Sequence, residues 1–176
     1  MPYTVVHGPP TYFDSTHAWA PATGAVPPVL GDTNKEPRVL PQIVIEQIAG
    51  WFDLPDLTDN RAPRTFGVGE LPYPSRSTGK TLVYECRVEA ADQLDLTLTA
   101  NAVKQGFSDQ DSEGTMTVTP WASYGGSVWT YTARVVALQF DPKFTVRDDG
   151  ATFEWGLVLT LRMSDPHFYL DGTGYL

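Results

Sequence analysis

Residues 153–163 read FEWGLVLTLRM, and large apolar side chains occupy every second position of this stretch. These side chains are Phe153, Trp155, Leu157, Leu159, Leu161 and Met163. Successive side chains of a strand point to opposite faces of its sheet, so the alternation predicts a half-buried β-strand. Its apolar face needs a second layer to cover it, which favours a β-sandwich or a barrel.

Earlier segments of the chain also have strand character. Residues 43–48 are rich in β-branched side chains, and residues 82–89 alternate with Cys86 on the apolar side. Residues 115–121 and 128–140 flank a glycine-rich turn, which is typical of a hairpin. A mainly β chain is therefore predicted, in which Cys86 acts as a small buried apolar residue.

Residues 91–105 fit either a strand or a helix. Leucines recur at every second position, but Leu94, Leu98 and Ala102 also follow one another along one helical face. Asp92 stands at the start of this stretch, where a side-chain oxygen can cap a helix. We therefore predict one helix, with Leu94, Leu98 and Ala102 as its apolar face.

Composition limits the class of protein. The 176 residues include 15 glycines and 15 prolines, which disfavours a helix bundle and suits short strands joined by turns. Twelve Lys and Arg against 21 Asp and Glu give a formal charge of −9. Tight nucleic-acid binding needs cationic side chains that neutralise phosphates, so this charge disfavours it. No apolar run approaches the length of a membrane span, and residues 1–10 lack the features of a secretory signal.

Prolines concentrate in the first part of the chain, where Pro2 to Pro74 holds 12 of the 15. Residues 1–38 are therefore predicted to form an extended arm that stays out of the interior of any sheet, ahead of a domain at 39–176. The arm nevertheless carries Tyr12, Phe13 and Trp19, which is unusual for a free linker. Two interpretations remain open: an arm that packs on its own domain or on a neighbouring subunit, and a flexible leader.

A long polar excursion at residues 55–80 is rich in proline and glycine. It exceeds the common loop length of about 4–6 residues, and such excursions in compact domains are functional or form extended hairpins.

Motifs for catalysis are missing from the sequence. It contains no G-x-S-x-G, no phosphate-binding glycine loop and no H-E-x-x-H, so neither an enzyme nor a cofactor is predicted. Asp109, Asp111 and Glu113 match the first ligand positions of a calcium loop, but Pro120 stands where the bidentate Glu should be. An acidic solvated connection is favoured over a calcium site.

Four aromatic residues cluster around one predicted turn: Trp121, Tyr124, Trp129 and Tyr131. Exposed aromatic faces can hold sugar rings, whereas cross-strand aromatic pairs stabilise sheets. Packing or a subunit interface is favoured, and a carbohydrate-binding β-sandwich module is kept as the alternative function.

An ordered series of features suggests a family. A β-run ends in a turn at Gly50-Trp51, the excursion follows, and an Arg-x-x-Gly-Lys-x-Leu segment at 76–82 leads into a strand. Later, a Ser-Asp-Pro-His-Phe-Tyr segment at 164–169 follows the final long strand. From about Ile43 to Tyr169 the chain resembles the N-terminal domain of the distal tail proteins, or minor tail proteins, of long-tailed, non-contractile bacteriophages. Gly50, Asp165, Pro166, Phe168 and Tyr169 carry the resemblance.

The resemblance implies a β-sandwich with one helix and a projecting hairpin, which forms a hexameric ring between the tail tube and the tail tip or baseplate hub. The hairpin would reach a neighbour, so Arg61, Arg64, Tyr73 and Arg76 become interface candidates, together with Tyr12, Phe13 and Trp19 of the arm. The chain ends seven residues after Tyr169. We therefore expect a ring-only version that lacks the second, sugar-binding domain of many members.

The resemblance also implies partners and a location. The partners are further copies of the chain, the tail-tube protein, the hub, baseplate or tail-tip protein, and the tape measure protein. Genomic DNA would be met only in transit, through a channel whose negative charge keeps it from adhering, and no membrane is involved. The protein would be made in the cytoplasm of the bacterial host and reside at the tail tip of the virion.

Overall fold

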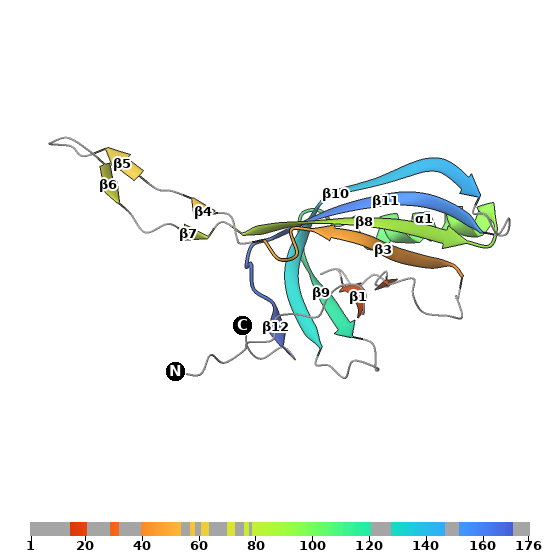
Figure 1. Cartoon of the computed structure of the whole chain (residues 1–176), viewed down its shortest axis with the longest axis horizontal. Helices are drawn as coiled ribbons and strands as arrows, with labels where there is room; N and C mark the ends of the chain where they lie inside the picture. The colour runs from red at the N-terminus through yellow and green to blue at the C-terminus, as the bar shows by residue number, and fades with distance from the viewer. Residues whose placement is uncertain are drawn as a thin grey trace.

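A computed structural model describes residues 15–20, 29–31, 40–53, 57–58, 61–63, 70–72, 76–77, 79–120, 128–146 and 152–170. Within these ranges the chain is mainly antiparallel β-sheet with one helix, as predicted (Figure 1). The strands before the helix are β1 (Ser15–Ala20), β2 (Val29–Leu30), β3 (Gln42–Ala49), β4 (Leu57–Thr58), β5 (Arg61–Pro63), β6 (Glu70–Pro72), β7 (Arg76–Ser77) and β8 (Lys80–Ala90). The remaining elements are α1 (Gln93–Gly106), β9 (Glu113–Pro120), β10 (Trp129–Val146), β11 (Phe153–Met163) and β12 (Tyr169–Leu170).

One sheet makes up the body of the protein, with strand order β2-β1-β9-β10-β11-β8-β3 and β12 added beside β10. The two ends of this order meet at a parallel bridge between Gly31 and Val44. The Gly31 amide donates to the Ile43 carbonyl at 2.8 Å, and the Ile45 amide donates to the Gly31 carbonyl at 2.7 Å. The sheet therefore closes on itself around a single core.

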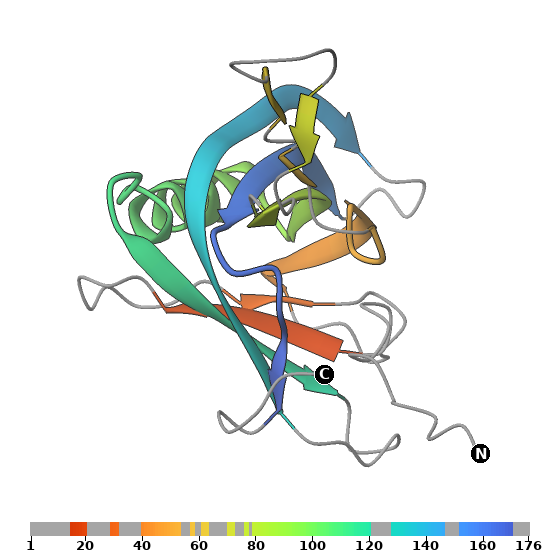
Figure 2. The ribbon, with the colours of Figure 1, turned by 90° about the vertical axis from the view of Figure 1, so that its left-hand side faces the viewer.

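Strand β10 carries the sheet from one layer of the sandwich to the other. Residues 129–134 pair with β9, and the rest of the strand pairs with β11. Two register shifts interrupt the β11 pairing, and β10 curves strongly across the molecule (Figure 2). Bulges bend a strand and increase its twist, which allows one strand to serve both layers.

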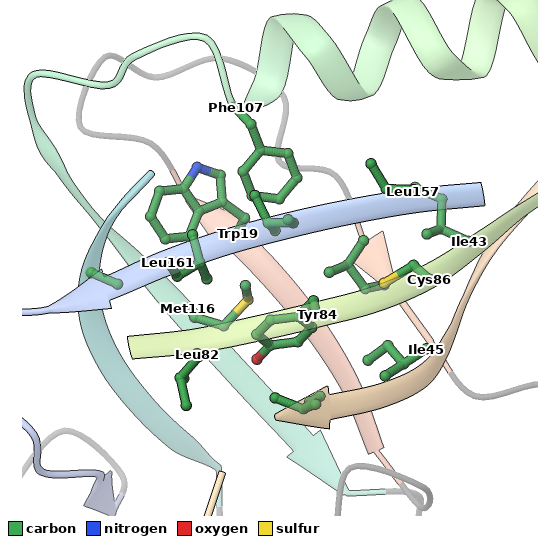
Figure 3. Close-up of a cluster of buried hydrophobic side chains, with 14 of the residues drawn as sticks. Trp19, Ile43, Ile45, Leu82, Tyr84, Cys86, Phe107, Met116, Leu157 and Leu161 are labelled. Atoms are coloured by element: carbon green, nitrogen blue, oxygen red, sulfur yellow. The ribbon is translucent and has the colours of Figure 1, made fainter. Parts of the chain in front are cut away.

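The core lies between the layers and follows the predicted alternation. Strands β8 and β11 pair along their whole lengths, with Leu157 opposite Cys86 and Leu161 opposite Leu82. These side chains are buried, and Tyr84 stands among them (Figure 3). Burial raises the pKa of the Cys86 thiol to about 12, which keeps it a neutral apolar group.

Helix α1 begins where it was predicted, because the Asp92 carboxylate accepts a hydrogen bond from the Asp95 amide at 2.8 Å. The predicted apolar face is wrong. Leu94 and Leu98 are 67% and 56% exposed, and Ala102 is also exposed. The buried positions are Leu96, Ala100, Val103 and Gly106. Leucines occupy both sides of the helix, and only its packing against β8 and β11 selects the buried side.

The N-terminal stretch contradicts the prediction that it stays out of the sheet interior. Strand β1 lies between β2 and β9, and each of its residues has a partner in β9. Residues 15–20 contain no proline, so every one of them can donate to the ladder. The sandwich thus includes residues on the N-terminal side of the predicted boundary at residue 38.

Trp19 fixes β1 in the core rather than presenting itself to a neighbour. Its side chain is fully buried, and its ring stacks on Phe107 with centroids 5.5 Å apart. Gly114 makes room for it, because a Cβ there would lie 2.3 Å from the indole. The proposed role of Trp19 in a subunit interface is therefore corrected to a core role.

Candidate functional site

The feature that stands apart from the sandwich is a hairpin that projects from the ends of β3 and β8 (Figure 1). It contains two short ribbons, in which β4 pairs with β7 and β5 pairs with β6. Among the described strands these four pair only with one another. The predicted hairpin is confirmed, and it is the part of the fold best placed to reach another molecule.

Two glycines define the root of the hairpin. Gly50 has φ +83° and Gly79 has φ +104°, a region that L side chains rarely adopt. A Cβ on Gly50 would lie 2.2 Å from the Thr81 carbonyl oxygen, and one on Gly79 would lie 2.2 Å from the Met163 carbonyl oxygen. The chain therefore leaves β3 and returns to β8 in close contact with neighbouring backbone.

Side chains next to these glycines hold the root in place. Trp51 is buried, and its carbonyl oxygen accepts a 2.6 Å hydrogen bond from the Lys80 ammonium. Lys80 Nζ also lies 5.6 Å from the centre of the Phe168 ring. Burial lowers the pKa of Lys80, and the nearby Asp53 carboxylate opposes that shift. Both branches of the hairpin are thus tied to each other and to the core.

An aromatic cluster continues from Trp51 into the sandwich. Its rings belong to His17, Trp51, Tyr84, Tyr131 and Phe168, with centroids 5.0–6.4 Å apart between contacting pairs. The residues come from β1, the root turn, β8, β10 and the segment before β12. Tilted and edge-on arrangements of this kind add stability beyond simple burial.

A chain of hydrogen bonds crosses the cluster. His17 Nδ1 is hydrogen-bonded to the Tyr84 hydroxyl at 2.9 Å, which is hydrogen-bonded to the Tyr131 hydroxyl at 2.6 Å. Burial lowers the pKa of His17 to about 3, so the imidazole is neutral near pH 7. Burial also raises the pKa of both tyrosines. The chain satisfies buried polar groups and contains no group poised to exchange a proton near neutral pH.

One carboxylate, that of Asp165, holds the closing segment at 164–169 together through local hydrogen bonds. Asp165 accepts hydrogen bonds from the His167 amide at 3.1 Å, from the His167 ring at 2.5 Å and from the Tyr169 hydroxyl. Burial would raise the pKa of Asp165, but these bonds outweigh it and the pKa lies below its usual value. The turn delivers Phe168 to the aromatic cluster and Tyr169 to strand β12. Together with Gly50, the residues that carry the family resemblance thus build the hairpin root and close the fold.

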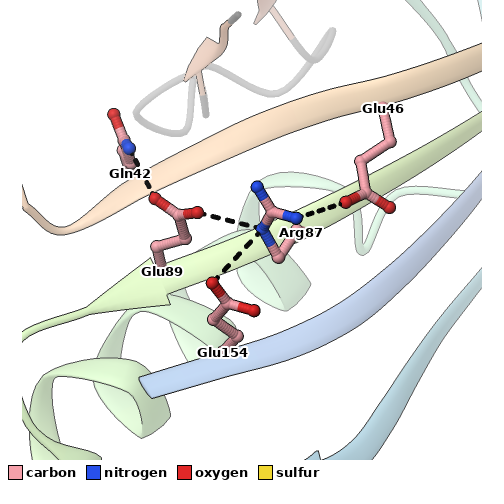
Figure 4. A network of polar contacts seen from close by, with 5 residues as sticks. All are labelled: Gln42, Glu46, Arg87, Glu89 and Glu154. Carbon is pink, nitrogen blue, oxygen red and sulfur yellow. Dashed lines mark hydrogen bonds and ion pairs between the residues drawn. The ribbon is translucent and has the colours of Figure 1, made fainter. Parts of the chain in front are cut away.

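A charged network occupies the outward face of the sheet (Figure 4). The Arg87 guanidinium contacts Glu46 at 2.6 Å, Glu89 at 2.9 Å and Glu154 at 3.6 Å. The Gln42 amide donates to Glu89 at 2.6 Å. Three carboxylates share one guanidinium: Glu46 is exposed, Glu154 is largely covered and Glu89 is fully buried. Sequence reasoning missed the network, although Arg87 between Glu85 and Glu89 on the polar side of an alternating strand signalled a charged face.

The structure describes only some of the other residues that were predicted to form an interface or a metal site. Arg61 and Arg76 lie in β5 and β7 of the hairpin, whereas Arg64, Tyr73, Tyr12 and Phe13 lie outside the described residues. Asp109 Oδ1 accepts from the Asp111 and Ser112 amides at 3.2 and 3.1 Å, and Glu113 accepts from the Ser164 hydroxyl at 2.5 Å. In the part of the chain that the structure describes, no three His, Cys, Asp or Glu side chains are grouped to hold a metal.

The two described residues of the aromatic turn do not offer the exposed platform that sugar binding needs. Trp129 is 6% exposed and Tyr131 is fully buried, so both belong to the core. Trp121 and Tyr124 lie outside the described residues. The packing interpretation is confirmed for the two described residues. Over the same described ranges, no helix is long and apolar enough to cross a bilayer.

The chain was compared with protein-family models, with curated proteins and with solved structures, and only the solved structures include a similar protein. No family model matches the chain, and no curated protein matches it. Among solved structures, it is similar to the SPP1 Dit (gp 19.1) protein, described as a paradigm of the hub adsorption apparatus in phages that infect Gram-positive bacteria. The TM-score is 0.51 at 15% sequence identity.

The chain has the fold of a phage distal tail protein. The similarity covers 73% of this chain and 46% of the Dit chain, so it spans about half the length of that protein. At this identity the match establishes a shared fold. The resemblance read from Gly50 and residues 164–169 thus agrees with the fold at the level of architecture.

Proposed function

We propose that this protein is a structural component of a phage tail tip. In this role it is a distal tail adaptor that forms a ring between the tail tube and the tip or baseplate hub and leaves a channel for DNA. The observation that carries the proposal is the fold shared with the SPP1 Dit protein. The hairpin that projects from a rigid root supports it, because a ring requires each copy to reach the next.

The partners follow from that role. Copies of the chain form the ring, which is a hexamer in this proposal, and its two faces meet the tail-tube protein and the hub, with the tape measure protein nearby. The hairpin, with Arg61, Arg64, Tyr73 and Arg76, is the element proposed to engage a neighbour. Function then resides in shape and docking, without catalysis.

The charged side chains on the outward face of the sheet support a channel to which DNA does not adhere. Among the described side chains that are at least partly exposed, the outward face of the β3–β8–β11–β10 layer carries four carboxylates and three guanidinium groups: Glu46, Glu85, Asp141 and Glu154 against Arg87, Arg134 and Arg162. A surface of this sign repels phosphates. Retention of the assembled ring on DNA at physiological salt would count against this assignment.

Mass measurement tests the ring directly. A hexamer has a mass of about 116 kDa, six times the 19.4 kDa of one chain. Light scattering after size-exclusion chromatography, with negative-stain imaging, should show rings with a central hole. The same preparation, incubated with purified tail tubes, should bind their ends. A monomer that ignores tail tubes but binds a glycan array would instead support the carbohydrate-binding alternative.

A further inference from the structure

The segment that follows β11 starts beside the root of the hairpin and ends beside β10. We call residues 164–170, which comprise the closing segment and the whole of β12, the strap. In Figure 1 and Figure 2 the blue chain leaves β11 at the hairpin root and runs along the end of the sandwich to β12. A Cβ on Gly79 would lie 2.2 Å from the Met163 carbonyl oxygen and 3.6 Å from the Ser164 Cα. The returning branch of the hairpin therefore lies against the start of the strap.

Phe168 is the side chain that joins the strap to the hairpin root. Its ring is buried, and its centre lies 5.0 Å from that of Trp51 on the outgoing branch. Lys80 Nζ, at the end of the returning branch, lies 5.6 Å from the centre of the same ring. A third contact, with ring centres 5.3 Å apart, joins Phe168 to Tyr131 of β10. One ring thus contacts both branches of the hairpin and the core.

Both branches of the hairpin pass through a glycine at the root. Gly50 lies at the start of the outgoing branch and Gly79 at the end of the returning branch, and glycine has access to more backbone conformations than any other residue. Hinges are element-terminal positions of this kind, where a few residues absorb the change in φ and ψ. Beyond the two glycines, β4 to β7 pair only with one another among the described strands. The direction of the hairpin therefore depends on the packing at its root.

The backbone attachment of the strap to the sheet is short. Strand β12 has two residues, and it pairs with β10 at two positions. The Ser164 hydroxyl donates to Glu113 of β9 at 2.5 Å, whereas the hydrogen bonds that Asp165 accepts from His167 and Tyr169 lie within the strap. Proteins open locally, without global unfolding, where few backbone pairs have to break. Little backbone pairing has to break for the strap to leave the sandwich.

We propose that the strap is a latch that sets the direction of the hairpin. With Phe168 seated against Trp51 and Lys80, the hairpin points in one direction relative to the sandwich. When the strap leaves, the hairpin swings about Gly50 and Gly79 while the sandwich stays folded. A partner that draws β12 away from β10 thereby releases the hairpin, so the strap and the hairpin are coupled. The latch operates within a single copy and does not rest on the proposed ring.

Distances between two spin labels test the latch in the full-length protein. Ala62→Cys places one label on β5 of the hairpin, and Val158→Cys places the other on the exposed face of β11. The native Cys86 remains, because it is buried and burial raises the pKa of its thiol. Dilution with excess unlabelled protein restricts the measured distances to those within one copy. The protein with an unsubstituted strap should give one narrow distance distribution.

Removal of the Phe168 ring should free the hairpin. Phe168→Ala should broaden the distance distribution at least about twofold, because the hairpin then samples many directions. The amides of residues 79–82 should also exchange with solvent at least about tenfold faster. Phe107→Ala is the matched control, since it removes the same buried side chain where it stacks on Trp19. The control should lower the melting temperature and leave the distribution narrow.

Lys80→Met reaches the same contact from the hairpin side. It keeps an apolar stem but removes the hydrogen bond to the Trp51 carbonyl and the ammonium group beside the Phe168 ring. It should also broaden the distribution. In the double variant with Phe168→Ala it should add little, because both substitutions act through one contact. If Phe168→Ala does not melt cooperatively, Lys80→Met decides by the same criteria.

The outcomes separate the latch from the ring. A distribution in Phe168→Ala as narrow as that of the unsubstituted protein overturns the latch, and so does equal broadening in Phe107→Ala. A broad distribution before any substitution overturns it as well. Because the distances lie within one copy, each of these results leaves the ring proposal standing. Conversely, an unsubstituted protein that forms no rings and ignores tail tubes overturns the proposed function, while narrow distances that broaden in Phe168→Ala still support the latch.

Discussion

At the scale of single residues, Gly50 and Gly79 determine where the hairpin leaves the sandwich. Both have positive φ, and a Cβ on either one would lie 2.2 Å from a carbonyl oxygen of an adjacent strand. Neither requirement can be met by another residue type without moving β8 or β11. Gly50, which belongs to the family resemblance, is thus required for the conformation of the backbone at the hairpin root.

Gly50→Ala should lower the free energy of unfolding by more than about 2 kcal/mol, because strained φ and a carbonyl clash add together. Urea denaturation measures the loss. Gly156→Ala is the control, since a Cβ there would lie 3.4 Å from its nearest neighbour, the Asp141 Cβ. Equal losses for the two substitutions would contradict the assigned role of Gly50.

His17 should make stability depend on pH. Burial holds its folded-state pKa at about 3, below the unfolded value of 6.5. Between these values the unfolded chain binds the additional proton, so stability rises with pH and is lost as pH falls from about 6.5. The slope can reach about 1.4 kcal/mol per pH unit. Urea midpoints measured from pH 7 to pH 4.5 should fall accordingly.

Substitution isolates the imidazole in this effect. His17→Gln should be less stable at pH 7, because it loses the contact with Tyr84, but its stability should change less with pH. Tyr131→Phe disturbs the same hydrogen-bond chain and retains His17, so it should keep the slope of the unsubstituted protein. An unaltered slope in His17→Gln would show that other groups cause the pH dependence.

At the scale of elements, the buried and exposed faces of helix α1 should contribute very differently to stability. Leu96→Ala should cost about 2–5 kcal/mol, because it leaves a cavity beneath the helix. Leu98→Ala, two residues further along, removes an exposed side chain and should leave stability within about 0.5 kcal/mol. Thermal and urea denaturation of the pair would show which face is buried, and a larger loss for Leu98→Ala would reverse the assignment.

Strand β1 should be indispensable for folding. Deletion of residues 2–20 removes the partner of one edge of β9, the buried Trp19 ring and the His17 contact with Tyr84. We expect loss of cooperative unfolding in circular dichroism. A truncated protein that melts cooperatively near the original temperature would show that the N-terminal stretch is a dispensable arm.

At the scale of the whole molecule, the hairpin should be separable from the sandwich. Replacement of residues 57–77 by a short Gly-Ser linker keeps Gly50, Trp51, Phe52 and Gly79, which form the root. The melt should be nearly unchanged, because β4 to β7 pair only with one another among the described strands. Assembly into rings, or binding to tail tubes, should be lost. Normal assembly would remove the hairpin from the proposed function.

Several features of the fold could be predicted because the information is local. The alternation in residues 153–163 and 82–89 assigns each side chain to a face through the geometry of the strand itself. Asp92 marks the start of the helix through a bond to a residue three positions later. The length and the turn residues of the excursion at 55–80 predicted an extended hairpin.

By itself, the sequence determined the β-rich class, the single helix, the projecting hairpin and the resemblance of its root and closing segment to distal tail proteins. Only the tertiary structure decided which leucines of α1 are buried, that β1 enters the sheet, and that Gly31 and Val44 close it. It also placed Arg87 beside carboxylates of β3 and β11. The physical reason is separation along the chain: the His17–Tyr84 hydrogen bond joins residues 67 positions apart, and no periodic pattern in sequence records such a contact.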